Sequence, residues 1–124
     1  MSLKETVPFE KRTAESQRIL SKYPDRVPVI AEKAPRSNLP EIEKKKFLVP
    51  GTMHCGEFKY IIHKHIQQAA NGTGLAADQT IYLFTSTNRT TTVKSGEMMS
   101  EIYDRYKADD GFLYIAYSAE NTLG

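Results

Sequence analysis

The pattern of hydrophobic and polar positions is most regular in the middle of the chain, over residues 55–70. Four hydrophobic residues there recur at the spacing of one helical face, namely Phe58, Ile61, Ile62 and Ile66. Asn71-Gly72 follows as a stop signal, because both residues tolerate the left-handed conformation that ends many helices. The pattern predicts one long amphipathic helix that lies across a sheet.

Three further helices are predicted. Ser2 and Glu5 have the spacing of a capping box, which indicates a short helix near the N-terminus. A charged helix over 8–22 begins at Pro8, and another helix over 96–107 is capped by Ser95. The residues expected to face inward are Phe9, Ile19, Leu20 and Tyr23 in the former, and Met99, Ile102, Tyr103 and Tyr106 in the latter.

Four segments have the hydrophobic pattern of β-strands, and they are 27–33, 45–50, 79–85 and 111–118. In the first, Val27, Val29 and Ala31 share one face, while Pro28 and Ile30 share the other. The last is almost wholly apolar, which is typical of a central strand buried on both faces. The second is short, opens with lysines and closes on a proline, so it is predicted to be an exposed sheet edge with unpaired backbone groups.

The predicted order is helix, helix, β, β, α, β, α, β, with a polar loop over 86–94. A hairpin, a long helix and two more strands make an α+β fold of the ubiquitin-like β-grasp type, with a four-stranded mixed sheet and two extra N-terminal helices. We expect one structural domain in three parts: a helical extension over 1–24, the β-grasp over 25–118, and a flexible tail over 119–124.

Composition and charge narrow the class of partner. The chain has 124 residues, of which 40% are hydrophobic and 26% charged, which is ordinary for one globular domain. A net charge of +2 gives no case for nucleic acid. Residues 1–50 hold 11 Lys/Arg against 7 Asp/Glu, whereas residues 51–124 hold 6 against 8. The first part therefore suits acidic partners, although a solvated surface of mixed charge explains the same counts.

No catalytic or metal site is predicted. Cys55 is the only cysteine, which excludes an intramolecular disulfide and favours a reducing, cytoplasmic compartment. His54 beside it suggests a base next to a nucleophile, but adjacent side chains project in different directions and no orienting third group is identifiable. His63 and His65 point to nearly opposite faces of their helix, so they are not expected to bind one metal ion together.

A signal peptide and a run of about 20 apolar residues are both missing, so membrane contact requires a surface or an added lipid.

Five segments together carry a family resemblance. They resemble the autophagy ubiquitin-like modifiers, which include the GABA-receptor-associated proteins and the microtubule-associated light chains, over about residues 4 to 124. The resemblance implies a β-grasp domain with two N-terminal helices. The segments are PFEKR (8–12), KYPDRVPVI (22–30), EKAPR (32–36), KKKFLVP (44–50) and FLYIAYS (112–118).

The resemblance also implies a conjugation mechanism. In the family a cysteine protease exposes a C-terminal glycine, an activating enzyme takes it as a thioester, and a conjugating enzyme passes it to phosphatidylethanolamine. Gly124 is therefore the expected lipid attachment residue, either without trimming or in a matured chain. The lipid is a covalent modification and no cofactor is expected. We expect a cytoplasmic protein that becomes lipid-anchored on autophagosomes or related vesicles.

A peptide groove is the second implied site, for cargo receptors and adaptors whose motifs read aromatic-x-x-aliphatic. By resemblance its aromatic pocket is lined by Glu15, Ile19, Pro28, Ile30, Lys46, Leu48 and Phe112, and its aliphatic pocket by Phe47, Val49, Pro50, Met53, Phe58, Ile61 and Ile62. Arg26, Lys44 and Lys46 would face acidic residues that flank the motif. The alternative is that Phe58, Ile61 and Ile62 belong to the core and that the lysines are a solvated charge run.

Departures from the family pattern leave other functions open. Residues 67–77 look like an insertion, His63 and His65 stand where arginines are common, and Leu123 stands where an aromatic residue is common. The alternatives are an unconjugated β-grasp adaptor, a modifier of protein lysines, and a microtubule or vesicle-trafficking module that uses the basic N-terminal helices.

Overall fold

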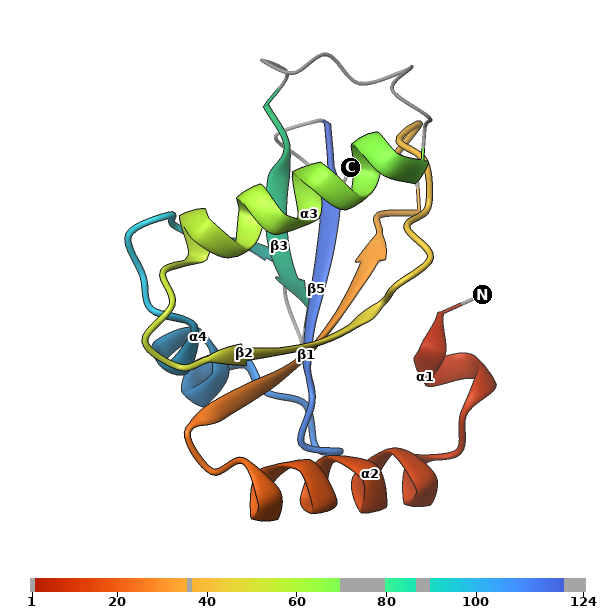
Figure 1. Cartoon of the computed structure of the whole chain (residues 1–124). Coiled ribbons are helices and arrows are strands. Elements are labelled where there is room, and N and C mark those ends of the chain that lie inside the picture. The colour runs from red at the N-terminus through yellow and green to blue at the C-terminus, as the bar shows by residue number, and fades with distance from the viewer. Residues whose placement is uncertain (1, 36, 70–79, 87–89, 120–124) are drawn as a thin grey trace.

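A computed structural model describes residues 2–35, 37–69, 80–86 and 90–119 (Figure 1). Its five strands are β1 (Arg26–Lys33), β2 (Lys46–Pro50), β3 (Tyr82–Ser86), β4 (Thr90–Thr92) and β5 (Leu113–Ser118). They form one sheet in the order β2-β1-β5-β3-β4, in which β1 and β5 are parallel and the other neighbours antiparallel. The prediction of a mixed sheet is confirmed, with β5 in the centre and β2 at an edge, but the described residues form five strands where four were predicted.

The short strand β4 corrects the prediction of a polar loop over 86–94. Thr90–Thr92 pairs antiparallel with β3, with Thr92 opposite Phe84 and Thr90 opposite Ser86. Threonine is β-branched and suits a pleated strand, but three consecutive threonines show no hydrophobic alternation. The hydrophobic pattern therefore gave no sign of this strand.

The described residues contain four helices, one in each predicted segment, but the last begins at residue 99 where residue 96 was predicted. They are α1 (Leu3–Thr6), α2 (Phe9–Lys22), α3 (Cys55–Ala69) and α4 (Met99–Tyr106). The amide of Ser2 donates to the Glu5 carboxylate at 3.1 Å, as the capping-box spacing indicated.

The prediction that Ser95 caps the last helix is wrong. Met98 precedes α4, and its amide donates to the Glu101 carboxylate at 3.0 Å. The carbonyl oxygen of Ser95 instead accepts the amide of Gly56 at 3.0 Å. The segment before α4 is thus tied to the start of α3 and does not begin a helix.

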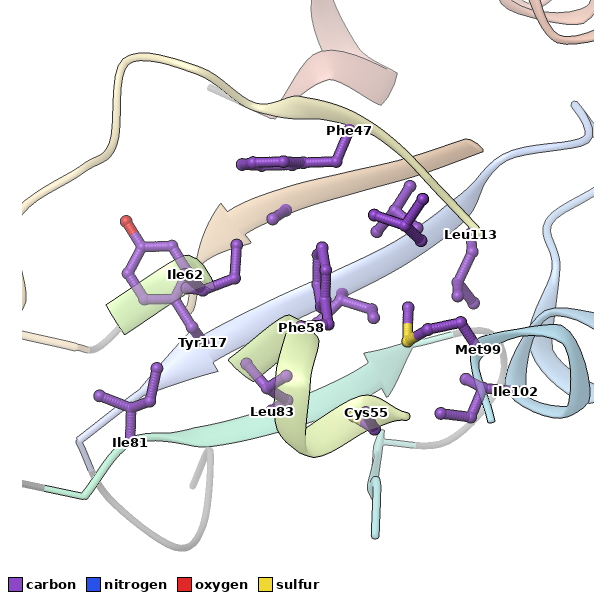
Figure 2. Close-up of a cluster of buried hydrophobic side chains, with 14 of the residues drawn as sticks. Phe47, Cys55, Phe58, Ile62, Ile81, Leu83, Met99, Ile102, Leu113 and Tyr117 are labelled. Carbon is purple, nitrogen blue, oxygen red and sulfur yellow. The ribbon is translucent and has the colours of Figure 1, made fainter. Parts of the chain in front are cut away.

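The main core lies between α3 and the sheet (Figure 2). Phe58, Ile62 and Ile66 of α3 are fully buried, and Ile61 is half-buried. Val27, Val29 and Ala31 of β1 face the same core, as their alternation predicted. Each fully buried side chain of this size stabilises the fold by about 1.5–3 kcal/mol.

A smaller cluster covers the other face of the sheet. Ile30, Phe112 and Tyr114 are buried there against Leu3 of α1 and Ile19 of α2. β5 is consequently buried on both faces, as predicted for a central strand.

The stripe predicted for α2 is partly wrong. Phe9 is 45% exposed and Tyr23 is 38% exposed, although both were expected to face inward. Phe9 is the first residue of the helix and Tyr23 lies just past its last residue, so both are at the ends of the element. Ser16 is buried instead, midway along the helix.

Candidate functional site

The edge strand β2 carries the candidate site. Within the described residues its only neighbour in the sheet is β1, with Phe47 opposite Val29 and Leu48 opposite Pro28. The backbone groups on its outer side are therefore available to an added strand. This confirms the prediction of an exposed edge.

Side chains of β2 alternate between the two faces of the sheet. Phe47 and Val49 are buried in the main core with α3. Lys46 and Pro50 are exposed and Leu48 is half-buried, in the register that places them on the face of α2. The edge thus offers different residues to each side.

Most of the residues expected around an aliphatic pocket belong to the core. Phe47 is 7% exposed, and its ring meets that of Phe58 edge-on, with centroids 5.6 Å apart. Four of the seven are buried, Met53 and Ile61 are half-buried and pack against the core, and Pro50 is exposed; the buried four are Phe47, Val49, Phe58 and Ile62. The core alternative therefore holds for Phe58 and Ile62.

The residues expected around an aromatic pocket come together between α2, β1, β2 and β5. Pro28, Ile30 and Phe112 are buried, and Ile19 packs against the cluster that contains the last two. Lys46 donates to both carboxylate oxygens of Glu15 at 2.9 Å, which links β2 to α2. Both partners are partly exposed, so the pair contributes at most about 1 kcal/mol and opens at little cost.

Cations and a hollow lie next to the edge. The ammonium of Lys44 is 5.1 Å from the centre of the Phe47 ring, and Arg26 is exposed opposite Pro50. His65 contacts the same ring edge-on, with centroids 5.3 Å apart. A pocket of ≈ 430 Å³ is lined by Glu43, Lys44, His65, Gln68 and Ala69. Sequence spacing gave no sign of it, because its residues come from two distant segments.

A buried polar network beneath α2 also escaped prediction. Asp110 accepts hydrogen bonds from Arg12 at 2.6 Å and from the Tyr114 hydroxyl at 2.5 Å. Ser16 donates to the Asp110 carbonyl oxygen. Burial, and secondarily the bond to Asp110, raises the pKa of Tyr114, so its hydroxyl stays protonated at neutral pH.

The structure gives no support to a cysteine nucleophile. Cys55 is buried, and burial raises the pKa of its thiol to about 11, so the reactive thiolate is scarce at neutral pH. His54 faces Glu57, with 3.5 Å between Nδ1 and Oε1. Among the described residues, no group of three or more His, Cys, Asp or Glu is placed to hold a metal ion.

The proposed attachment residue is not described. Gly124 and Leu123 lie outside the described residues, as does the greater part of the 67–77 insertion. Within the described ranges, no helix is both long enough and apolar enough to cross a membrane.

Comparison with known proteins places the chain among close relatives. The family model described as "Autophagy protein Atg8 ubiquitin like" matches residues 11–124. Autophagy-related protein 8 of Dictyostelium discoideum is 49% identical, over 99% of this chain and 93% of its own. Autophagy-related protein 8e of Arabidopsis thaliana is also 49% identical, over 94% of this chain and 87% of its own.

Two solved structures have closely similar folds. Plasmodium falciparum Atg8, in complex with a Plasmodium falciparum Atg3 peptide, superposes with a TM-score of 0.83 at 52% identity, over 97% of each chain. Trypanosoma brucei ATG8 superposes with a TM-score of 0.82 at 34% identity, over 95% of this chain and 93% of its own.

Proposed function

Because the chain belongs to the Atg8 family of ubiquitin-like autophagy proteins, we propose that it is a modifier joined through Gly124 to phosphatidylethanolamine on autophagosomal membranes. A processing protease, an activating enzyme and a conjugating enzyme act on its tail, and the chain is their substrate. On the membrane it recruits cargo receptors and adaptors with aromatic-x-x-aliphatic motifs.

The observation that carries the peptide-binding part is the exposed edge of β2, with hydrophobic residues on both faces. A peptide that adds to this edge is itself a strand, so its residues i and i+3 project to opposite faces. The residues assigned to the aromatic pocket lie toward α2, and most of those assigned to the aliphatic pocket lie toward α3. The motif spacing therefore matches the separation of the two sets by the sheet.

Charge favours an acidic flank on the peptide. Lys44 lies two residues before β2, Lys46 begins β2 and Arg26 begins β1, and all three are exposed. The exposed pair between Lys46 and Glu15 can rearrange to admit an aromatic ring, because such pairs stabilise the fold only slightly. Plasmodium falciparum Atg8 is described in complex with an Atg3 peptide, which supports an Atg3 segment as one ligand of this chain.

The lipid supplies membrane affinity in this proposal. Burying acyl chain contributes about 0.8 kcal/mol per CH₂, and stable anchoring takes two signals. Phosphatidylethanolamine brings two chains in one reaction, so conjugation converts a cytosolic protein into a firmly held one. Glycine suits the attachment point because it lacks Cβ and passes through a narrow enzyme channel.

A tryptophan-containing peptide tests the groove directly. The chain contains no tryptophan, so the emission of a Trp-x-x-Leu peptide with acidic residues before the tryptophan reports on the peptide alone. We expect a blue shift and a dissociation constant in the micromolar range, about −8 kcal/mol.

Two substitutions serve as test and control. Leu48→Ala should weaken binding about tenfold, whereas Tyr60→Ala, at a residue that is 63% exposed on α3, should leave binding unchanged. If adding wild-type protein leaves the tryptophan emission of the peptide unchanged, the proposed groove is refuted.

A further inference from the structure

We propose that Asp110 is a positioning residue for the aromatic pocket. With Arg12, Ser16 and Tyr114 it forms what we call the Asp110 network, which fixes α2 relative to the start of β5. None of the four residues is among those assigned to the pocket. The inference rests on the peptide-binding function proposed above and names what holds that site in shape.

Asp110 accepts hydrogen bonds from groups on several segments. Its Oδ2 accepts from Arg12 Nη1 at 2.6 Å and from the Tyr114 hydroxyl at 2.5 Å. Its Oδ1 accepts from the amide of Phe112 at 2.9 Å, and its carbonyl oxygen accepts from Ser16. One residue thus binds α2 twice and the β5 segment twice.

The network and the pocket share one face of α2. Residues 12, 15, 16 and 19 follow the three- and four-residue spacing of a single helical face. Arg12 and Ser16 bind Asp110, while Glu15 and Ile19 between and after them are assigned to the pocket. A movement of α2 that released the network would therefore move two pocket residues as well.

The other wall of the pocket depends on the same carboxylate. Phe112 is buried in the cluster against which Ile19 packs, and its amide donates a hydrogen bond to Asp110. Asp110 therefore contacts α2 through Arg12 and the segment before β5 through Phe112. The distance between α2 and this segment sets the width of the proposed pocket.

The turn that carries Asp110 is closely packed and hydrogen-bonded to α4. Gly111 has φ +91°, a conformation that favours glycine, and its carbonyl accepts the Tyr103 hydroxyl at 2.7 Å. A Cβ at Gly111 would lie 3.1 Å from the Cβ of Ser16, so α2 approaches the backbone directly. The turn leaves no room for the helix to settle closer.

Hydrophobic contacts alone hold α2 weakly. Of its hydrophobic residues, Phe9 is exposed and Ile19 and Leu20 are only half-buried. In the ion pair between Arg12 and Asp110, by contrast, the Asp110 side chain is 0% exposed and that of Arg12 is 12% exposed. Buried ionic groups are an inefficient source of stability, but in some proteins they specify one arrangement among several. We assign this role to the Asp110 network.

The test compares two peptides on a set of variants. One peptide carries the aromatic-x-x-aliphatic motif, and the other has alanine in place of the aromatic residue. We expect Asp110→Asn to weaken the first peptide by about fivefold or more, the scale of coupling within one network, and to leave the second within about twofold. Tyr114→Phe, which removes one hydroxyl, should act in the same direction with a smaller effect. Arg12→Lys should bind the first peptide more tightly than Arg12→Ala.

Amide chemical shifts separate positioning from general destabilisation. In Asp110→Asn, the amides of Ile19 and Phe112 should shift while those of Phe58 and Ile62 in the main core stay in place. Equal loss for both peptides, or wild-type affinity for both in Asp110→Asn and Tyr114→Phe, would overturn the inference. If Asp110→Asn fails to fold, Tyr114→Phe alone decides between these outcomes.

Hydrogen exchange keeps this inference distinct from the proposed function. If wild-type protein binds neither peptide, the proposed groove fails, and the network is then judged by exchange of the α2 amides. Faster exchange in α2 alone for Tyr114→Phe supports the network. Unchanged exchange overturns it.

Discussion

Truncation of two neighbouring residues of the edge strand should have different effects: at Phe47 it should lower the stability of the fold, and at Leu48 it should lower the affinity for peptide. Phe47 is 7% exposed and lies in the main core against the ring of Phe58 (Figure 2). Leu48 is half-buried on the other face, opposite Pro28 of β1. Phe47→Ala therefore tests the core, and Leu48→Ala tests the groove.

The expected magnitudes follow from burial. Truncating a buried phenylalanine to alanine costs about 3–5 kcal/mol. For a domain of this size that is a fall in melting temperature of roughly 10–20 °C. Leu48 loses only part of a leucine side chain from a half-buried position, so about 1 kcal/mol is expected. Its truncation should instead weaken an aromatic-x-x-aliphatic peptide about tenfold, which is 1.4 kcal/mol of binding.

Thermal and urea unfolding followed by circular dichroism measures the first effect, and titration of the tryptophan peptide well below the melting temperature measures the second. A double variant would confound them, because its loss of binding would include unfolding. Melting temperatures within about 3 °C of each other for the two single variants would refute the assignment of faces.

Three further predictions concern a turn, the pH and the ion pair at the edge. Gly111→Ala should lower the free energy of unfolding by about 1–3 kcal/mol, because Gly111 has a positive φ and an added Cβ would contact Ser16. Gly96→Ala is the control for the same urea titration and should have little effect, since a Cβ there meets nothing within 4 Å. Equal effects of the two substitutions would contradict this prediction. Burial raises the pKa of Cys55 from 9.0 to about 11 and that of Tyr117 from 10.0 to about 12. The folded state therefore binds both protons more tightly than the unfolded state does, and the free energy of unfolding should fall as the pH rises from 9 to 12. The urea midpoint should drop less between pH 8 and 11 in Cys55→Ala, and a flat profile in the wild type would be the contrary result. Lys46→Met should change unfolding by less than about 1 kcal/mol while weakening acidic-flanked peptides most strongly at low salt; salt-independent weakening would argue against a charge contact.

Much of the fold could be predicted because hydrophobic periodicity reflects burial. The face of α3 appears in the spacing of Phe58, Ile62 and Ile66, and the two faces of β1 appear in its alternation. The edge position of β2 followed from its lysines and its proline. These features depend on residues close together in the sequence, so one segment contains the whole signal.

The features that escaped prediction depend on distant partners. Arg12 and Asp110 are 98 residues apart, and neither has a local pattern that indicates a buried pair. Ser16 is buried because Gly111 allows the backbone to approach it, which no rule for serine in a helix suggests. β4 exists because β3 offers a partner to three threonines. In each case tertiary contact overrides what the segment alone indicates.

The two sides of the expected peptide site also differ in how well they could be predicted. The residues around Glu15 and Lys46 could be assigned from the family resemblance, and the structure brings them together. The residues on the α3 side are mostly core, since a helix that covers the sheet must bury Phe58 and Ile62 there. A binding role for that side depends on the partly exposed Met53, Ile61 and Pro50.

Mass spectrometry of the C-terminal peptide from membrane-bound protein tests the central proposal most directly. The conjugation account predicts a peptide ending in Gly124 that carries the mass of phosphatidylethanolamine and is absent from cells that express Gly124→Ala. A membrane fraction in which Gly124 bears only a free carboxylate, or a bond to a protein lysine, would contradict it.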